Sequence, residues 1–263
     1  MKQVKFVLLL AAAGALLLLF RPEGKGGKAS ADVATVESVD PLKNPGQPVS
    51  DYLVFRALTT GEARMAVTGS SVTKGSGASN QSKTWRALTQ AHLRTVYPSL
   101  NTLKIENHGH SGYTSVRLLE DEVTGPVIAG RPDVLIIETS VINNHNKNVS
   151  LDDTYASLEQ LHALYSEVLP EARILFISPN PITENKFGPQ VNTLGLQFTD
   201  YVYGTQAFIE NKGWAYINIH DEMLSLMEQR GVRLPETLKD GIHPNDLGYR
   251  IWADVIWPHL TAK

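Results

Sequence analysis

Short apolar runs alternate along the chain with stretches in which apolar residues recur every three or four positions. Four runs are apolar almost throughout, at residues 65–67, 134–137, 174–177 and 215–219. Such runs are typical of strands that are buried on both faces of a parallel sheet. A fifth, short strand is expected at residues 103–107.

Residues with helical spacing follow most of these runs. Helices are expected over residues 85–96, 116–123, 150–169, 198–211 and 244–259. Residues 51–63 form either a short helix or an irregular lead-in. Because apolar strands alternate with helices, the chain is predicted to be an α/β protein, a three-layer α/β/α sandwich with a central parallel sheet.

The N-terminus differs from the rest of the chain. Two lysines within the first five residues precede an unbroken run of apolar and small residues at positions 6–20, and residues 29–31 read Ala-Ser-Ala. This pattern predicts export, by a cleaved signal peptide or with an uncleaved membrane anchor. We therefore expect a signal peptide or anchor at residues 1–31, a linker and lead-in at 32–60, a single domain at 61–263, and a periplasmic or secreted location.

The amino-acid composition excludes several kinds of binding and catalysis. Of 263 residues, 42% are hydrophobic and 19% are charged, as in globular proteins, and the net charge is −3. No basic block is dense enough to predict binding to nucleic acid. The chain has no cysteine, which excludes disulfides, a thiolate nucleophile and a metal held by cysteine.

The first candidate for chemistry directly follows the first apolar strand. Residues 69–73 read Gly-Ser-Ser-Val-Thr. A serine at such a turn lies near the carboxyl edge of the sheet, where open α/β folds place their sites. On these residues alone, a polar turn with incidental serines remains the alternative.

A base for such a serine is expected near the C-terminus. Asp240 stands three residues before His243 in a loop with Gly241, just before the last helix. The glycine allows the carboxylate to turn back onto the imidazole, whose second nitrogen can then face a serine. An ordinary helix entry would have similar residues.

Two further segments follow predicted strands. Residues 107–114 read Asn-His-Gly-His-Ser-Gly-Tyr-Thr, and the N–H of Gly109 can approach a developing oxyanion because glycine lacks a side chain. Asn143 and Asn144 come after the strand at residues 134–137, where a side-chain amide can supply another donor. His108 and His110 can share one face for a metal, but no third ligand has suitable spacing, so no metal is expected.

Taken in order, these four segments resemble the motifs of the SGNH hydrolase superfamily, the GDSL-type esterases and lipases. The family's serine, glycine, asparagine and Asp-x-x-His blocks match residues 69–73, 107–114, 132–143 and 240–243. The resemblance spans about residues 64–258 and places the nucleophile at Ser71.

The resemblance implies a flavodoxin-like sandwich and a serine esterase that cleaves O-acyl or O-acetyl esters through an acyl-enzyme. It implies a triad of Ser71, His243 and Asp240, and an oxyanion hole made by the N–H groups of Ser71 and Gly109 with the Asn143 amide. No cofactor is implied. The expected substrate is a small acyl ester or an acylated carbohydrate.

The chain departs from the family pattern at two places. Ser70 stands where the family has an aspartate, from which we expect altered loop hydrogen bonding rather than lost activity. In the asparagine block, Asn143 fits only with one inserted residue; without it, Ile142 takes the amide position, and Asn144 is a rival to Asn143. Two alternatives therefore stay open: an O-acetyltransferase acting on envelope or exported polysaccharide, and a non-catalytic carbohydrate-binding relative.

Overall fold

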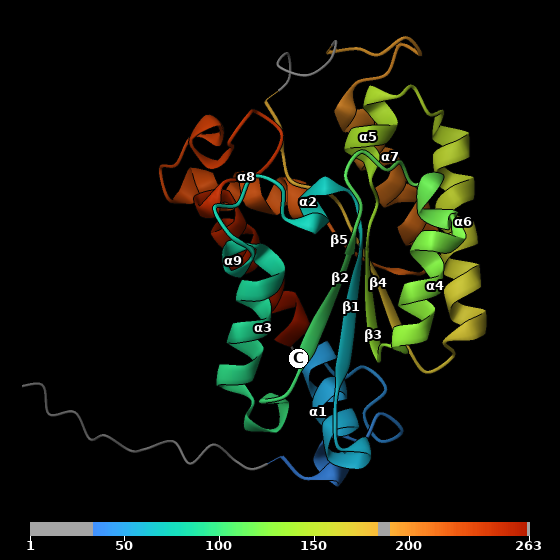
Figure 1. The fold of residues 1–263 in the computed structure, drawn as a ribbon, viewed down its shortest axis with the longest axis vertical. Coiled ribbons are helices and arrows are strands. Elements are labelled where there is room, and N and C mark those ends of the chain that lie inside the picture. The colour runs from blue at the N-terminus through green and yellow to red at the C-terminus, as the bar shows by residue number, and fades with distance from the viewer. Residues whose placement is uncertain (1–33, 184–189, 262–263) are drawn as a thin grey trace, which may run out of the picture. The chain divides into compact units, whose positions relative to one another are not determined.

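The computed structural model describes residues 34–183 and 190–261, which lie in one compact unit. Its centre is a five-stranded parallel sheet in the order β2-β1-β3-β4-β5 (Figure 1). The strands are β1 (Arg64–Gly69), β2 (Lys104–Gly109), β3 (Val134–Glu138), β4 (Arg173–Ile177) and β5 (Ala215–Ile217). The three-layer α/β prediction is confirmed, and the strand order reverses between β1 and β3.

Helices cover both faces of this sheet (Figure 1). They are α1 (Val49–Thr60), α2 (Ser71–Lys74), α3 (Trp85–Val96), α4 (Asp121–Gly130), α5 (Val141–Asn146), α6 (Leu151–Val168), α7 (Phe198–Asn211), α8 (Ile219–Gln229) and α9 (Asp246–Thr261). Helices α3 and α9 lie on one face, whereas α4 and α6 lie on the other. Crossovers of this kind place every strand's carboxyl end at one edge of the sheet.

The strand side chains alternate between two cores. Val134 and Ile136 of β3 belong to the core that includes α1, α3 and α9, and Leu135 and Ile137 belong to the core beneath α4 and α6. All four side chains are fully buried. The continuous apolar runs arise because both faces of each strand are covered.

The compact unit begins at Ala34, earlier than the boundary at residue 61 that the sequence suggests. Helix α1 lies in this earlier part, and its residues Tyr52, Leu53 and Val54 are buried in the core that also includes α3 and α9. The phenolic hydroxyl of Tyr52 also donates to the carbonyl of Glu171, 2.6 Å away. The signal or anchor segment predicted at residues 1–31 lies outside the described residues, and no helix within the described part is long and apolar enough to cross a bilayer.

The helix expected at residues 116–123 is wrong in its position. The chain forms a 3-10 turn at Arg117–Leu119 and then α4, which continues past Gly125 and Pro126. Those two residues predict an early end, but buried Val123 and Val127 fix both halves of α4 to the core. Tertiary packing therefore overrides local propensity here.

Candidate active site

The turn after β1 presents Ser71 at the carboxyl edge of the sheet. Gly69 has a φ of +155°, and a Cβ there would lie 2.7 Å from the Glu138 carboxylate. Only glycine allows the strand end to pass this close to β3. Ser71 then opens α2, so its backbone N–H is one of the first-turn donors that a helix leaves unpaired.

The loop before α9 holds the imidazole of His243. One oxygen of Asp240 accepts the backbone N–H groups of Ile242 and His243, at 3.1 and 2.9 Å, and the other lies 2.7 Å from Nδ1 of His243. Gly241 supplies the positive φ, +94°, that this tight loop needs. Burial favours the neutral carboxyl, but these hydrogen bonds outweigh it and place the pKa of Asp240 below its ordinary value.

The two segments meet although 172 positions separate them in the sequence. Oγ of Ser71 lies 2.9 Å from Nε2 of His243, within hydrogen-bond distance. Ser71 is only 8% exposed, and the His243 side chain is 25% exposed. Asp240, His243 and Ser71 thus form one continuous chain of hydrogen bonds at the surface.

Backbone packing keeps these segments together. A Cβ at Gly77 would lie 2.4 Å from the Pro244 carbonyl oxygen and 2.9 Å from Cβ of His243. The buried hydroxyl of Tyr249, on α9, donates to the Ser76 carbonyl at 2.7 Å. The backbone just after α2 therefore packs directly against the His243 loop, and a side chain at position 77 would not fit between them.

Gly109 does not fit the role expected for it. Its N–H already donates to Oδ1 of Asn107, 3.0 Å away. A Cβ at Gly109 would lie 2.2 Å from the backbone nitrogen of Lys74, so this glycine allows β2 to pack against α2. Gly109 is therefore a packing residue in this structure.

The second glycine of the same block is in a different position. Gly112 lies in a turn closed by the Tyr113 N–H and the His110 carbonyl, 3.3 Å apart, and has a φ of +75°. Its own N–H donates to no group in the described part of the chain. The His110 N–H donates to the Gly69 carbonyl at 2.8 Å, so the turn begins directly beside the Ser71 loop. The sequence reasoning missed Gly112, whose signal was its place in the same glycine block.

The two asparagines after β3 have different environments. Asn144 is fully buried, and its amide bonds the backbone N–H and hydroxyl of Ser115 and the hydroxyl of Thr154. Asn143 is half-buried and donates to the Tyr113 carbonyl at 2.8 Å. Asn143 is therefore the amide that contacts the glycine turn, and Asn144 holds α5 in place.

The histidines considered for a metal have other contacts. Nε2 of His108 lies 3.4 Å from Glu106, and the ring of His110 packs on Tyr113 with centroids 4.9 Å apart. Burial lowers the pKa of His110. Across residues 34–183 and 190–261, no three His, Asp or Glu side chains gather as a set of metal ligands.

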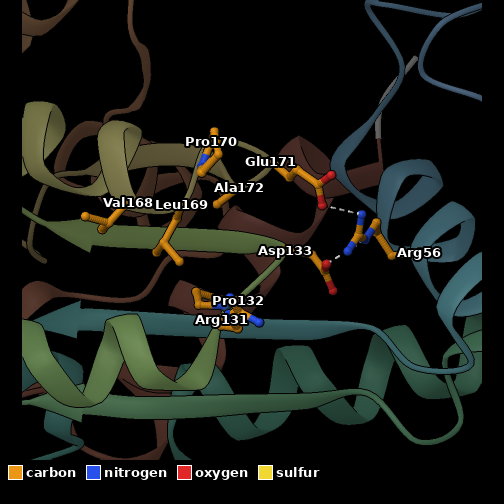
Figure 2. Close-up of a pocket in the computed structure, with 9 residues that line it drawn as sticks. All are labelled: Arg56, Arg131, Pro132, Asp133, Val168, Leu169, Pro170, Glu171 and Ala172. Atoms are coloured by element: carbon orange, nitrogen blue, oxygen red, sulfur yellow. Dashed lines mark hydrogen bonds and ion pairs between the residues drawn. The ribbon is translucent and has the colours of Figure 1, made fainter.

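A cavity of about 360 Å³ lies at the opposite edge of the sheet (Figure 2). It adjoins Asp133 and Ala172, which precede β3 and β4, whereas Ser71 follows β1. The Arg56 guanidinium in this cavity is paired with Asp133 at 2.7 Å and Glu171 at 2.9 Å. These three charged side chains are thus paired with one another.

The model of the GDSL-like lipase/acylhydrolase family matches residues 67–251, from β1 into α9. The chain belongs to this family. It is accordingly a serine hydrolase that acts on ester bonds. Among curated proteins, none matches this GDSL-family chain.

Solved structures of esterases share the fold of this GDSL-family hydrolase. An Axe2 mutant, an acetyl-xylooligosaccharide esterase from Geobacillus Stearmophilus, is 19% identical with a TM-score of 0.61, over 76% of this chain and 95% of that one. The acetyl xylan esterase AlAXEase is 17% identical with a TM-score of 0.58, over 74% and 98%.

A two-domain esterase active on acetylated mannans (CEX) is 19% identical with a TM-score of 0.56, over 75% of this chain and 48% of that one. The match therefore spans about half the length of the two-domain protein. At these identities the three likenesses show a common fold, and their substrates are properties of those proteins.

Proposed function

We propose that this protein hydrolyses carboxylic esters through an acyl-enzyme on Ser71, with His243 as general base and Asp240 as its orienting carboxylate. The observation that carries the proposal is the unbroken series of contacts, 2.7 Å from Asp240 to His243 and 2.9 Å from His243 to Ser71. A serine hydroxyl is a weak nucleophile and needs a base at this distance.

The reaction has two steps. Nε2 of His243 takes the proton as Oγ of Ser71 attacks the ester carbonyl, and the same proton then goes to the leaving alcohol. His243 next takes a proton from water, which attacks the acyl carbonyl, and returns it to Oγ of Ser71 as the acid leaves. Asp240 stabilises the imidazolium in both steps, and its lowered pKa keeps it ionised at neutral pH.

Three donors are proposed for the oxyanion. Within the described residues, neither the N–H of Ser71, at the start of α2, nor the N–H of Gly112 donates to another group. The Asn143 amide uses one N–H on the Tyr113 carbonyl and has a second N–H to offer. Gly112 replaces Gly109 in this role because the Gly109 N–H is occupied.

The substrate that we propose is an O-acetylated or otherwise acylated carbohydrate. The fold neighbours named as acetyl-xylooligosaccharide and acetylated-mannan esterases support it by analogy. The apolar run at residues 6–20 supports export and a periplasmic or secreted location, by a cleaved signal peptide or with an uncleaved membrane anchor. The experiment described next also tests the alternative, in which the acyl group is transferred to a sugar hydroxyl instead of to water.

The test is turnover of p-nitrophenyl acetate by the wild type and by Ser71→Ala. We expect Ser71→Ala to lose at least about 1,000-fold in kcat, since removing the serine of a protease triad costs about 10⁶-fold. Ser166→Ala, on the exposed face of α6, is the matched control and should keep full activity. Equal rates for wild type and Ser71→Ala would refute the triad, and a rate gain with added oligosaccharide, giving acylated sugar, would identify a transferase.

A further inference from the structure

The direction of the Gly112 N–H depends on a single peptide unit. Residues 110–113 form a four-residue turn closed between His110 and Tyr113, with Gly112 in its third position. A positive φ there, +75°, is that of a type II turn. Types I and II differ mainly by a flip of the central peptide, which joins Ser111 to Gly112 and carries this N–H.

Two side chains of the α5 segment bind the next two carbonyls of this turn. The Asn143 amide donates to the Tyr113 carbonyl at 2.8 Å, and the Lys147 ammonium donates to the Gly112 carbonyl at 2.6 Å. Residues 143 and 147 are four apart and lie on one side of a helical turn. The lysine bond is charge-assisted, which makes it stronger than a bond between neutral groups.

The support behind these side chains is firm. Asn144 ties α5 to Ser115 and to Thr154 of α6 through three hydrogen bonds of 2.7 to 2.9 Å. Asn192 donates to the His145 carbonyl at 3.2 Å from a third segment. Helix α5 is therefore fixed to its neighbours independently of the glycine turn, and can hold that turn in one conformation.

We propose that Lys147 is a positioning residue that keeps the Gly112 N–H directed at the oxyanion. The inference rests on the proposed function, because it presumes that Gly112 is an oxyanion donor. Lys147 itself does not contact the reacting atoms in this role. By holding the Gly112 carbonyl, while Asn143 holds that of Tyr113, it restrains the turn and so opposes a flip of the Ser111–Gly112 peptide.

The experiment compares Lys147→Met, which keeps the length of the side chain without its charge, with Lys147→Arg, which restores a cationic donor. The matched control is Lys104→Met, an exposed lysine at the amino end of β2. Steady-state kinetics with p-nitrophenyl acetate give kcat and KM separately. Binding of an alkylboronic acid, which forms a tetrahedral adduct with serine, reports on the oxyanion hole.

We expect Lys147→Met to lose about tenfold in kcat, with KM changed less than twofold and an equal loss in boronate affinity. The loss is smaller than the roughly 100- to 1,000-fold cost of deleting a donor, because the turn still visits the productive conformation. Lys147→Arg should recover most of the rate, and Lys104→Met should match the wild type.

Two outcomes would overturn the role of Lys147. One is a kcat for Lys147→Met within twofold of the wild type, and the other is a rise in KM that accounts for the whole loss. Either result, with Ser71→Ala inactive, removes only this inference. Full activity in Ser71→Ala would instead remove the proposed function on which it rests.

Discussion

The carboxylate of Glu138, at the end of β3, accepts the backbone N–H of Ser70, at the end of β1, at a distance of 2.7 Å. Glu138 is fully buried at the point where the strand order reverses. The Glu138 oxygen that accepts the Ser70 N–H also lies 3.2 Å from the Thr73 hydroxyl. The other Glu138 oxygen accepts the Ser140 N–H at 2.8 Å. A carboxylate from the neighbouring strand therefore holds the turn that presents Ser71.

This arrangement gives a physical account of Ser70. The family's block has an aspartate at that position, and here the nearby carboxylate comes from Glu138 instead. Burial raises the pKa of Glu138, while the hydrogen bonds from Ser70, Ser140 and Thr73 act in the opposite direction. All three of these groups donate a hydrogen bond, and an ionised carboxylate, which only accepts hydrogen bonds, is a suitable partner for them.

Replacing Glu138 by glutamine should destabilise the protein by about 1–3 kcal/mol, because the new NH₂ faces a backbone N–H and leaves it without an acceptor. Activity should fall as well, since Ser71 follows Ser70 directly. Urea unfolding and kcat with p-nitrophenyl acetate measure the two effects. Glu167→Gln, on the exposed side of α6, is the control. Unchanged stability in Glu138→Gln would show that the buried carboxylate has no structural role.

Asp240→Asn should reduce kcat by about 10³- to 10⁴-fold, because an amide does not hold the imidazole as a carboxylate does. Circular dichroism should show an unchanged fold. The exposed Asp152→Asn, at the start of α6, is the control for the loss of one negative charge. A loss of less than tenfold in Asp240→Asn would show that His243 acts without its carboxylate.

The same variant yields a pH dependence of stability. The folded-state pKa of Asp240 lies below its unfolded value, so the ionised carboxylate contributes stability above the unfolded pKa of about 3.9. That contribution is lost as the pH falls through the folded-state pKa. The difference in unfolding free energy between wild type and Asp240→Asn should therefore shrink from about pH 5 toward about pH 2. A difference that is constant over this range would contradict the lowered pKa.

Gly109→Ala and Gly112→Ala should separate packing from catalysis. At Gly109 the new methyl would meet the Lys74 backbone at 2.2 Å, so we expect a loss of stability of about 3 kcal/mol or more. At Gly112 the nearest atom is Nζ of Lys147 at 3.9 Å, and only the φ of +75° opposes alanine, at about 1–2 kcal/mol. Gly112→Ala should mainly lose kcat. The reverse pattern, with Gly109→Ala stable and inactive, would restore Gly109 as the donor.

The strands were the most predictable part of this fold. Their apolar residues are buried on both faces, and burial leaves a continuous pattern that does not depend on distant contacts. Helix α4 was less predictable, because Val127 holds it to the core beyond Pro126. Helix α8 begins with a side-chain cap from Asn218 onto Asp221, immediately after β5, where the sequence suggests only more strand.

The candidate site also combines residues that the sequence predicts with residues whose roles depend on distant contacts. The sequence motifs predict that Ser71 and His243 meet, and their side chains lie 2.9 Å apart. Which glycine has an unoccupied N–H depends on the Asn107 side chain and on the closeness of α2, and neither is visible as a motif. Lys147 was missed for a similar reason, since a lone surface lysine carries no pattern until the turn that it contacts is known.

A final prediction concerns the cavity at the amino edge of the sheet. The Asp133 side chain is only 8% exposed, and burial raises its pKa despite the ion pair with Arg56. Arg56→Met would leave this carboxylate without its cation, which should destabilise the protein by about 3 kcal/mol in urea unfolding. Arg131→Met, an exposed position lining the same cavity, should change stability by less than about 0.5 kcal/mol.

The kinetics of these two variants provide a further check. Arg56 lies at the end of the sheet opposite Ser71, so kcat per folded molecule should stay at the wild-type value in both variants. A fall in kcat for Arg56→Met without loss of stability would mean that this edge communicates with the Ser71 turn. An unchanged unfolding free energy would instead show that the Arg56–Asp133 pair contributes nothing net, because the cost of removing the two charges from water then equals their attraction.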